Sequence, residues 1–432
     1  MVSKKKKFGA FIFAVIFSIA VVGGVFGLCY YQGIVSYPWQ VKNVSSADNT
    51  LAFSKEEVSE PEEVVVEEKP EVKPEVKPEA QTVQEKPEVE PTVEETETTS
   101  EEEQEVDLDS LVSEDGIAKT GAKMDYYGAL SVTDGKLVDS HGKEVQLTGI
   151  STHGINWFPE FATPETIASL RNNFGINVIR IAMYTSDYNG YCVGGSDNQK
   201  DLMDKVCSAV DAATENEMYV IIDWHTLNDE NPNTYKAESI QFFGEMVRKY
   251  KDNDNVIYEI CNEPNGDTTW SDIKSYAKEV IPVIRNVDSD AVILVGTPEW
   301  SSDLESVQDD PLNFKNIMYT YHFYAASHKD DARKQLESAL EAGLPVFISE
   351  YGLVSADGNG SVNTKEAEKW YDIIDEYKLS SCIWNLSNKD EGSALISADC
   401  QSTLDWKYED LSEEGKYFFD KLSKGNIKEN DN

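Results

Sequence analysis

Eight apolar runs, rich in β-branched and aromatic residues, alternate with amphipathic helical patterns from about residue 124 onward. Runs that are apolar at nearly every position are typical of parallel strands buried on both faces. The alternation therefore predicts an α/β fold, and eight such strands over about 300 residues predict a (β/α)8 or TIM barrel. The predicted strands are residues 145–152, 177–184, 219–226, 256–263, 291–297, 317–324, 345–352 and 380–387.

An open doubly wound sheet is the alternative architecture. It would require a glycine-rich phosphate-binding turn after the first strand, and the stretch from Gly149 to Gly154 lacks that pattern. Ahead of the first strand, Asp134-Gly135 separates two alternating runs, which predicts a β-hairpin. We expect this hairpin to cover the lower mouth of the barrel.

The N-terminal region differs in composition from the predicted barrel. Four lysines, Lys4 to Lys7, precede an apolar stretch from Phe8 to Cys29, which is about long enough to cross a bilayer. No clean small-residue cleavage site follows, so residues 1–35 are predicted to be an uncleaved membrane anchor, with a cleaved signal as the alternative. Because flanking lysines stay in the cytoplasm, we expect the rest of the chain to be extracellular, tethered to the membrane or, after cleavage, secreted.

Residues 36–120 are predicted to be a disordered linker rich in Glu, Pro and Val, with the imperfect repeat KPEVKPEVKPE. Much of the formal net charge of −41 lies in it. This acidity argues against a nucleic-acid partner. The catalytic domain is predicted at residues 121–426. The six cysteines are too sparse for a disulfide framework, although Cys192 and Cys207 could pair.

Two glutamates follow apolar runs that end in turns. Glu263 lies in YEICNEPNG and Glu350 in PVFISEYG. Strand ends of this kind meet at the C-terminal mouth of a barrel, where barrel enzymes keep their chemistry. A pair of carboxyl groups is what cleavage of a glycosidic bond requires, one to protonate the leaving oxygen and one to attack the sugar. Other polar and aromatic residues of the predicted strands gather at the same rim: His153, Arg180, His225, Asn262, His322, Tyr324 and Trp384.

These motifs resemble glycoside hydrolase family 5, and within it the secreted bacterial endoglucanases (cellulases). The likeness runs from about Tyr126 to Phe418. It rests on HGINW (153–157), Arg180, the Trp224-His225 pair, NEPNG (262–266), HFYA (322–325), ISEYG (348–352) and WNLSNKDEGSAL (384–395).

The resemblance implies that Glu263 is the acid/base and Glu350 the nucleophile, and that no metal or other cofactor is needed. A general acid must hold its proton, and we expect burial and the nearby Glu350 to raise the pKa of Glu263. Arg180 and Tyr324 are expected to keep Glu350 ionised, and Asn262 to bond the sugar 2-hydroxyl. His322 completes the expected catalytic set.

Exposed indoles stack on the flat faces of sugar rings. The resemblance places Trp384 under the ring beside the scissile bond, Trp157 on the non-reducing side and Trp300 on the leaving-group side. Further residues are expected to bind the substrate: His153, Phe158, Tyr184, His225, Ala356 (through its backbone), Asp357, Lys389 and Glu391. Lys389 and Glu391 could instead be ordinary solvated loop charges.

The expected function is endo-acting hydrolysis of β-1,4-glucosidic bonds in cellulose or related β-glucans by a monomeric enzyme, with retention of configuration through a double displacement. Mannan, xylan and mixed-linkage glucan hydrolases of the same fold are alternatives, as is a surface-anchored carbohydrate-binding protein. A metal-dependent hydrolase could be proposed from Asp223-Trp224-His225, but the five histidines offer no paired His-x-His ligand set.

Overall fold

The computed structural model describes residues 117–120 and 125–430. The predicted anchor lies outside these residues, as does nearly all of the predicted linker, so both remain predictions. In the part of the chain that is described, no helix combines the length and the apolar character that crossing a membrane requires.

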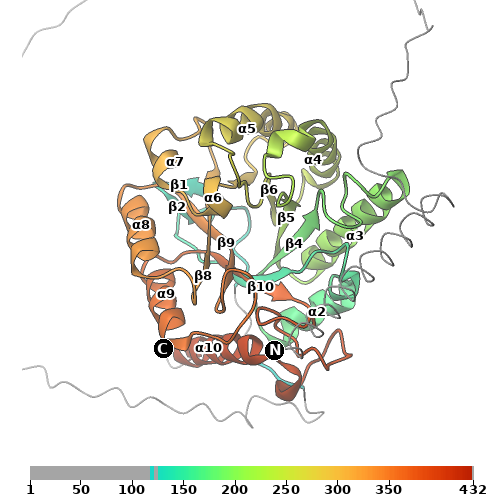
Figure 1. The fold of residues 1–432 in the computed structure, drawn as a ribbon, viewed down its shortest axis with the longest axis vertical. Helices are drawn as coiled ribbons and strands as arrows, with labels where there is room; N and C mark the ends of the chain where they lie inside the picture. The colour runs from blue at the N-terminus through green and yellow to red at the C-terminus, as the bar shows by residue number, and fades with distance from the viewer. Residues whose placement is uncertain (1–116, 121–124, 431–432) are drawn as a thin grey trace, which may run out of the picture. The chain divides into compact units, whose positions relative to one another are not determined.

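Eight parallel strands close into a barrel, which confirms the predicted architecture (Figure 1). The barrel closes because the last strand pairs with both the first strand and the seventh. Nearly every strand residue is buried, which explains why the strands are apolar throughout. The strands are β3 (Thr148–Thr152), β4 (Val178–Tyr184), β5 (Tyr219–His225), β6 (Val256–Glu259), β7 (Val292–Val295), β8 (Ile317–Tyr324), β9 (Val346–Gly352) and β10 (Ser381–Leu386).

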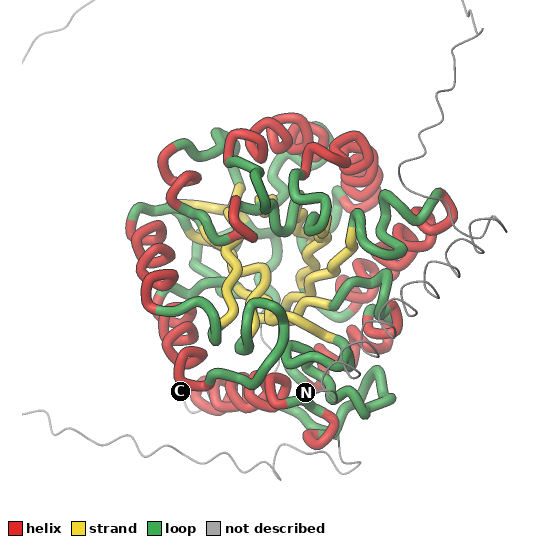
Figure 2. The backbone as a smooth tube through the Cα atoms, in the orientation of Figure 1, coloured by secondary structure: helices red, strands yellow, loops and turns green. Residues whose placement is uncertain are grey.

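Helices surround the strands as an outer ring (Figure 2). Helices form at the amphipathic patterns between the predicted strands: α2 (Pro164–Asn173), α3 (Ser196–Glu215), α4 (Lys236–Tyr250), α5 (Trp270–Arg285), α8 (Asp330–Glu341) and α9 (Thr364–Glu376). Elements that were not predicted are the short α6 (Pro298–Ser301) and α7 (Glu305–Asp309) between β7 and β8, and α10 (Glu413–Asn430) after β10. Single-turn 3-10 helices lie at Pro159–Phe161, Pro232–Tyr235 and Tyr408–Asp410.

The predicted hairpin is present as β1 (Ser131–Thr133) and β2 (Lys136–Val138). Its turn residues, Asp134 and Gly135, both have positive φ, as a tight hairpin turn requires. Leu137 packs in one apolar cluster with Tyr219 and Val292, which lie at the N-terminal ends of β5 and β7. The hairpin therefore covers the N-terminal end of the barrel, as expected, and leaves the opposite end for the site.

The described cysteines form no disulfide. Cys192 and Cys207, which the sequence allowed to pair, are free thiols that pack against the main core. Cys261 and Cys382 are free and fully buried, so they act as small apolar side chains.

Candidate active site

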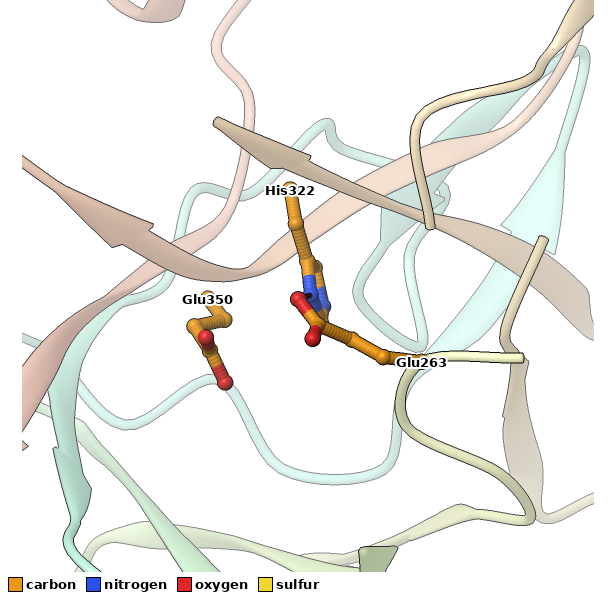
Figure 3. Close-up of side chains that lie close together, drawn as sticks. All are labelled: Glu263, His322 and Glu350. Carbon is orange, nitrogen blue, oxygen red and sulfur yellow. Dashed lines mark hydrogen bonds and ion pairs between the residues drawn. The ribbon is translucent and has the colours of Figure 1, made fainter. Parts of the chain in front are cut away.

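Glu263 and Glu350 meet at the C-terminal mouth of the barrel (Figure 3). One carboxyl oxygen of Glu263 lies within 4.8 Å of one carboxyl oxygen of Glu350. Glu350 lies in β9, but β6 ends at Glu259, so the prediction that Glu263 belongs to that strand is wrong. The chain leaves the ladder because the Glu263 N–H bonds instead to the carbonyl of Thr226, beyond β5. The two side chains remain 12% and 5% exposed, so a substrate can reach both.

A single buried arginine ties Glu350 to the floor of the site. Arg180, in β4, donates from Nη1 to Glu350 Oε2 over 3.1 Å. Its Nε and Nη2 donate to Glu259 over 2.8 and 3.1 Å, and Nη2 lies 3.0 Å from Asp223 Oδ2. One guanidinium thus faces three buried carboxyl groups and can neutralise the charge of only one. Burial raises the pKa of Asp223 to about 7, although Arg180 opposes that rise.

Glu350 receives two hydrogen bonds from the protein. Arg180 donates to one carboxyl oxygen, and the Tyr324 hydroxyl donates to the other over 2.8 Å. Both donors are those predicted from the sequence. Burial raises the pKa of Glu350, the charge of Glu263 adds to this rise, and Arg180 opposes it. The two donors therefore favour the ionised carboxylate, which is the form that can attack a sugar carbon.

Glu263 is the carboxyl group that keeps its proton near neutral pH. Burial raises its pKa to about 8, Arg180 opposes the rise, and the buried Asp223 and Glu259 add to it. The sequence predicts that the negative charge of Glu350 raises the pKa of Glu263. In the structure, the negative charges of Asp223 and Glu259 raise it, and the sequence alone does not reveal these two sources. His322 Nδ1 lies 2.9 Å from Glu263 Oε1, so the predicted His322 is part of the site.

Asn262 lies beside the two acids but is already bonded within the protein. Its Oδ1 accepts a hydrogen bond from Arg180 over 2.6 Å. Its Nδ2 donates to the Thr226 carbonyl and lies 3.2 Å from His225 Nε2. The other ring nitrogen of His225 lies 2.6 Å from Asp223 Oδ2. A sugar hydroxyl that bonds Asn262 must therefore compete with His225 for the amide.

One wall of the site is aromatic. Ring centroids lie 4.1 Å apart for Tyr184 and His225, 5.1 Å for Trp157 and Tyr184, and 5.4 Å for His225 and Trp384. His153 joins this wall and is 4.9 Å from Phe158. The wall brings together six of the predicted substrate-binding residues: His153, Trp157, Phe158, Tyr184, His225 and Trp384. The peptide bond that follows Trp384 is cis.

Trp300 lies apart from this wall, beside the segment that carries Glu263. Its side chain, on α6, is 53% exposed. Its backbone N–H donates to the Pro264 carbonyl. Glu299, Trp300 and Ser301 all have φ near +55°, a region that costs energy for residues other than glycine. Ser301 Oγ donates to the Asn262 carbonyl. This strained turn is therefore tied to the Asn-Glu-Pro segment, with the indole directed to solvent.

Two loops supply the remaining predicted residues. Lys389 Nζ lies 2.6 Å from Glu391 Oε2 and 3.2 Å from His153 Nε2, so both loop charges are held at the aromatic wall. Ala356 and Asp357 are exposed on the loop after β9. The Ala356 N–H donates to Ser327 Oγ, and Asp357 accepts from the Asn359 N–H. Neither of these two loop residues is hydrogen-bonded to Glu263 or Glu350.

Three buried polar residues near the acids were not predicted as part of the site. They are Asp223, which the sequence offered only as a metal ligand, Glu259 and Ser349. The available signal was a polar side chain inside an otherwise apolar strand, because burying such a group is costly unless it is bonded. Ser349 Oγ donates to Glu259 Oε1 over 2.9 Å.

The spacing of the two acids is that of glycosidases which retain anomeric configuration, in which the carboxyl groups are about 5 Å apart. Together with the barrel, it defines the chain as a retaining glycoside hydrolase. The model of the family Cellulase (glycosyl hydrolase family 5) matches residues 138–390. The chain belongs to this family, which confirms the resemblance found in the sequence.

Proteins that are similar to this chain in sequence include bacterial endoglucanases. The chain is 58% identical over 424 residues to Endoglucanase A of Butyrivibrio fibrisolvens, which covers 98% of this chain and 95% of that protein. It is 42% identical to an endoglucanase of Clostridium saccharobutylicum over 68% of this chain and 65% of that protein. Among solved structures, the catalytic domain of Thermobifida fusca endoglucanase Cel5A, in complex with cellotetraose, is 38% identical with a TM-score of 0.65. That match covers 68% of this chain and 97% of the domain.

Proposed function

We propose that this chain is an endo-β-1,4-glucanase that hydrolyses cellulose or related β-glucans with retention, using Glu263 as acid/base and Glu350 as nucleophile. The observation that carries the proposal is the approach of these two carboxyl groups within 4.8 Å at the open mouth of the barrel. The family and its named endoglucanase relatives support the substrate.

In the first step, a carboxylate oxygen of Glu350 attacks the anomeric carbon. The bond from that carbon to the glycosidic oxygen breaks, and Glu263 gives its proton to the departing oxygen. The products are a shortened glucan and a glycosyl ester on Glu350. The raised pKa of Glu263, about 8, keeps the proton available at neutral pH.

In the second step, a water molecule attacks the same carbon. Glu263, now a carboxylate, takes a proton from that water, and the bond to Glu350 breaks. Glu350 leaves as a carboxylate, which Arg180 and Tyr324 receive with the same two hydrogen bonds. Two inversions at one carbon return the original anomeric configuration.

The aromatic wall is proposed to bind sugar rings on the non-reducing side, with Trp384 beside the scissile bond. His153, Lys389 and Glu391 are proposed to bond sugar hydroxyls there. Trp300 is proposed to stack on a ring of the leaving group, because its exposed indole lies next to the Glu263 segment. Ala356 and Asp357 are proposed to contact sugars farther along the groove.

A substrate panel tests the proposal. Reducing-sugar release would be measured on soluble cellulose derivative, mannan, xylan and mixed-linkage glucan, with the anomer of the first product followed by NMR. We expect release from the cellulose derivative with retention, and none from Glu350→Gln. Preference for another polysaccharide would reassign the substrate, and binding without release by the wild type would make the chain a carbohydrate-binding protein.

We also propose that the enzyme is an extracellular monomer tethered through residues 1–35. The motivating feature is the lysine cluster ahead of the apolar stretch. Fractionation of cells should place activity in the membrane pellet, accessible to added protease. Activity in the medium on a chain lacking those residues would show that the segment is cleaved. Light scattering of residues 117–430 tests the monomer.

A further inference from the structure

A series of buried hydrogen bonds runs from Glu263 into the protein. Glu263 Oε1 lies 2.9 Å from His322 Nδ1, and His322 Nε2 lies 2.9 Å from Ser349 Oγ. Ser349 Oγ lies 2.9 Å from Glu259 Oε1. His322 is 2% exposed, while Ser349 and Glu259 are fully buried, so the three inner groups can satisfy their polar atoms only within the protein.

The direction of these bonds is set from the inner end. Both carboxyl oxygens of Glu259 accept hydrogen bonds from Arg180, so this carboxylate is an acceptor. The single proton of the Ser349 hydroxyl goes to Glu259, which leaves Ser349 Oγ to accept from His322 Nε2.

The state of His322 then follows. Burial lowers the pKa of His322 to about 4, so the ring is neutral and carries one N–H. With that hydrogen at Nε2, Nδ1 offers only a lone pair, and the group facing it must donate. The donor available is the carboxyl group of Glu263 in its protonated form.

We propose that Ser349 and Glu259 are positioning residues that hold His322 as the Nε2–H tautomer and thereby keep the proton on Glu263. This inference rests on the proposed role of Glu263 as acid. Loss of the proton would place a carboxylate against the Nδ1 lone pair, which destabilises the ionised form. The same repulsion makes the Glu263 carboxylate a stronger base toward water in the second step.

Other charged and titratable groups also act on Glu263, and the experiment must separate their effects from that of the tautomer. They come from five strands: Arg180 and Tyr184 on β4, Asp223 on β5, Glu259 on β6, Tyr324 on β8 and Glu350 on β9. Ser349 is uncharged, so replacing it changes the tautomer constraint without changing the charge of the site.

The test compares Ser349→Ala with Ser349→Thr. Without the Ser349 hydroxyl, His322 can adopt the Nδ1–H form and donate to an ionised Glu263. We expect the basic limb of the kcat/KM profile to move to lower pH by about one unit, with KM nearly unchanged and the wild-type limb restored in Ser349→Thr. Ser423→Ala, which removes a buried hydroxyl on α10, should leave the limb in place.

Nitrogen NMR of the histidine rings gives a second measurement that needs no activity. In the wild type, the His322 resonances, assigned by comparison with His322→Asn, should be those of a neutral ring protonated at Nε2. An Nδ1–H ring in the wild type would overturn the proposal, as would an unmoved basic limb in a folded Ser349→Ala. Failure of the wild type to hydrolyse any glucan would instead refute the proposed function, and the NMR result would still stand.

Discussion

Tyr324 on β8 donates its phenolic hydrogen to Oε1 of Glu350 on the neighbouring β9, over 2.8 Å. The remaining oxygen of Glu350 accepts from Arg180, so each carboxyl oxygen has one donor. This arrangement holds the carboxylate in one orientation toward the mouth of the barrel, and it stabilises the charged form relative to the neutral acid.

Removing the phenol should therefore shift the acid limb of activity. In Tyr324→Phe, the pKa of Glu350 rises further, so a higher pH is needed to ionise the nucleophile. We expect the acid limb of kcat/KM to move up by about one pH unit, and the plateau to fall by about tenfold, since one hydrogen bond to a charged group contributes about 1.5–3 kcal/mol. An unchanged acid limb would mean that Tyr324 does not act on Glu350.

The basic limb should report Glu263. Its pKa is raised to about 8, so Glu263 carries the catalytic proton below that pH and loses it above that pH. We expect kcat/KM on a cellulose derivative to fall tenfold per pH unit well above pH 8. Glu263→Gln should lose this limb with an aryl cellobioside whose leaving group needs no proton. A limb that persists in Glu263→Gln would assign the acid to another residue.

Arg180 should be required for stability as well as for catalysis. Its side chain is fully buried among Asp223, Glu259 and Glu350. Breaking a buried ion pair by removing one partner costs about 3–5 kcal/mol, so Arg180→Ala should lose that much free energy of unfolding in urea. The control is the exposed Lys200, which is paired with Asp204. Lys200→Ala should change the free energy of unfolding by less than about 1 kcal/mol.

The loss of stability in Arg180→Ala should also depend on pH. Without Arg180, the folded-state pKa values of the three acids rise further, so the folded form binds more protons than the unfolded chain. The loss of stability should therefore be largest at and above about pH 7, near the raised pKa of Asp223, and should shrink as the pH falls. A loss that is equal at pH 5 and pH 8 would contradict this account.

Two of the tryptophans proposed to contact the substrate, Trp300 and Trp384, should behave differently when replaced. Trp300 is 53% exposed and Trp384 is 6% exposed. Trp300→Ala should raise KM for long glucans and change the product lengths, while the free energy of unfolding stays within about 0.5 kcal/mol. Trp384→Ala should lower both kcat/KM and stability, the latter by about 3–5 kcal/mol because a buried indole is deleted. Urea titration and product chromatography measure these effects.

The barrel could be predicted from the sequence because its strands are buried on both faces and its helices are amphipathic. The hydrophobic patterns indicate which residues are buried, and the arrangement of buried residues is characteristic of the fold. The two acids could be predicted because each ends an apolar run. The extent of β6 could not, because its end at Glu259 depends on long-range hydrogen bonds: the Asn262 N–H donates to Trp224 within β5, and the Glu263 N–H donates to Thr226 just beyond it.

The inner part of the site was hidden for a similar reason. Glu259 and Ser349 look like isolated polar residues in their strands, and only the closed barrel brings them to Arg180 and His322. The helix α6 was missed because Glu299, Trp300 and Ser301 within it have left-handed φ values, which no local propensity favours. Tertiary contacts decided these features.

The shared guanidinium of Arg180 has a consequence for the covalent intermediate. In the free enzyme, Glu350 competes with Asp223 and Glu259 for a single positive charge. Once Glu350 becomes an ester, it carries no charge, and the cation is left to two acids instead of three. Formation of the intermediate thus relieves electrostatic crowding beneath the sugar, and hydrolysis of the ester restores it.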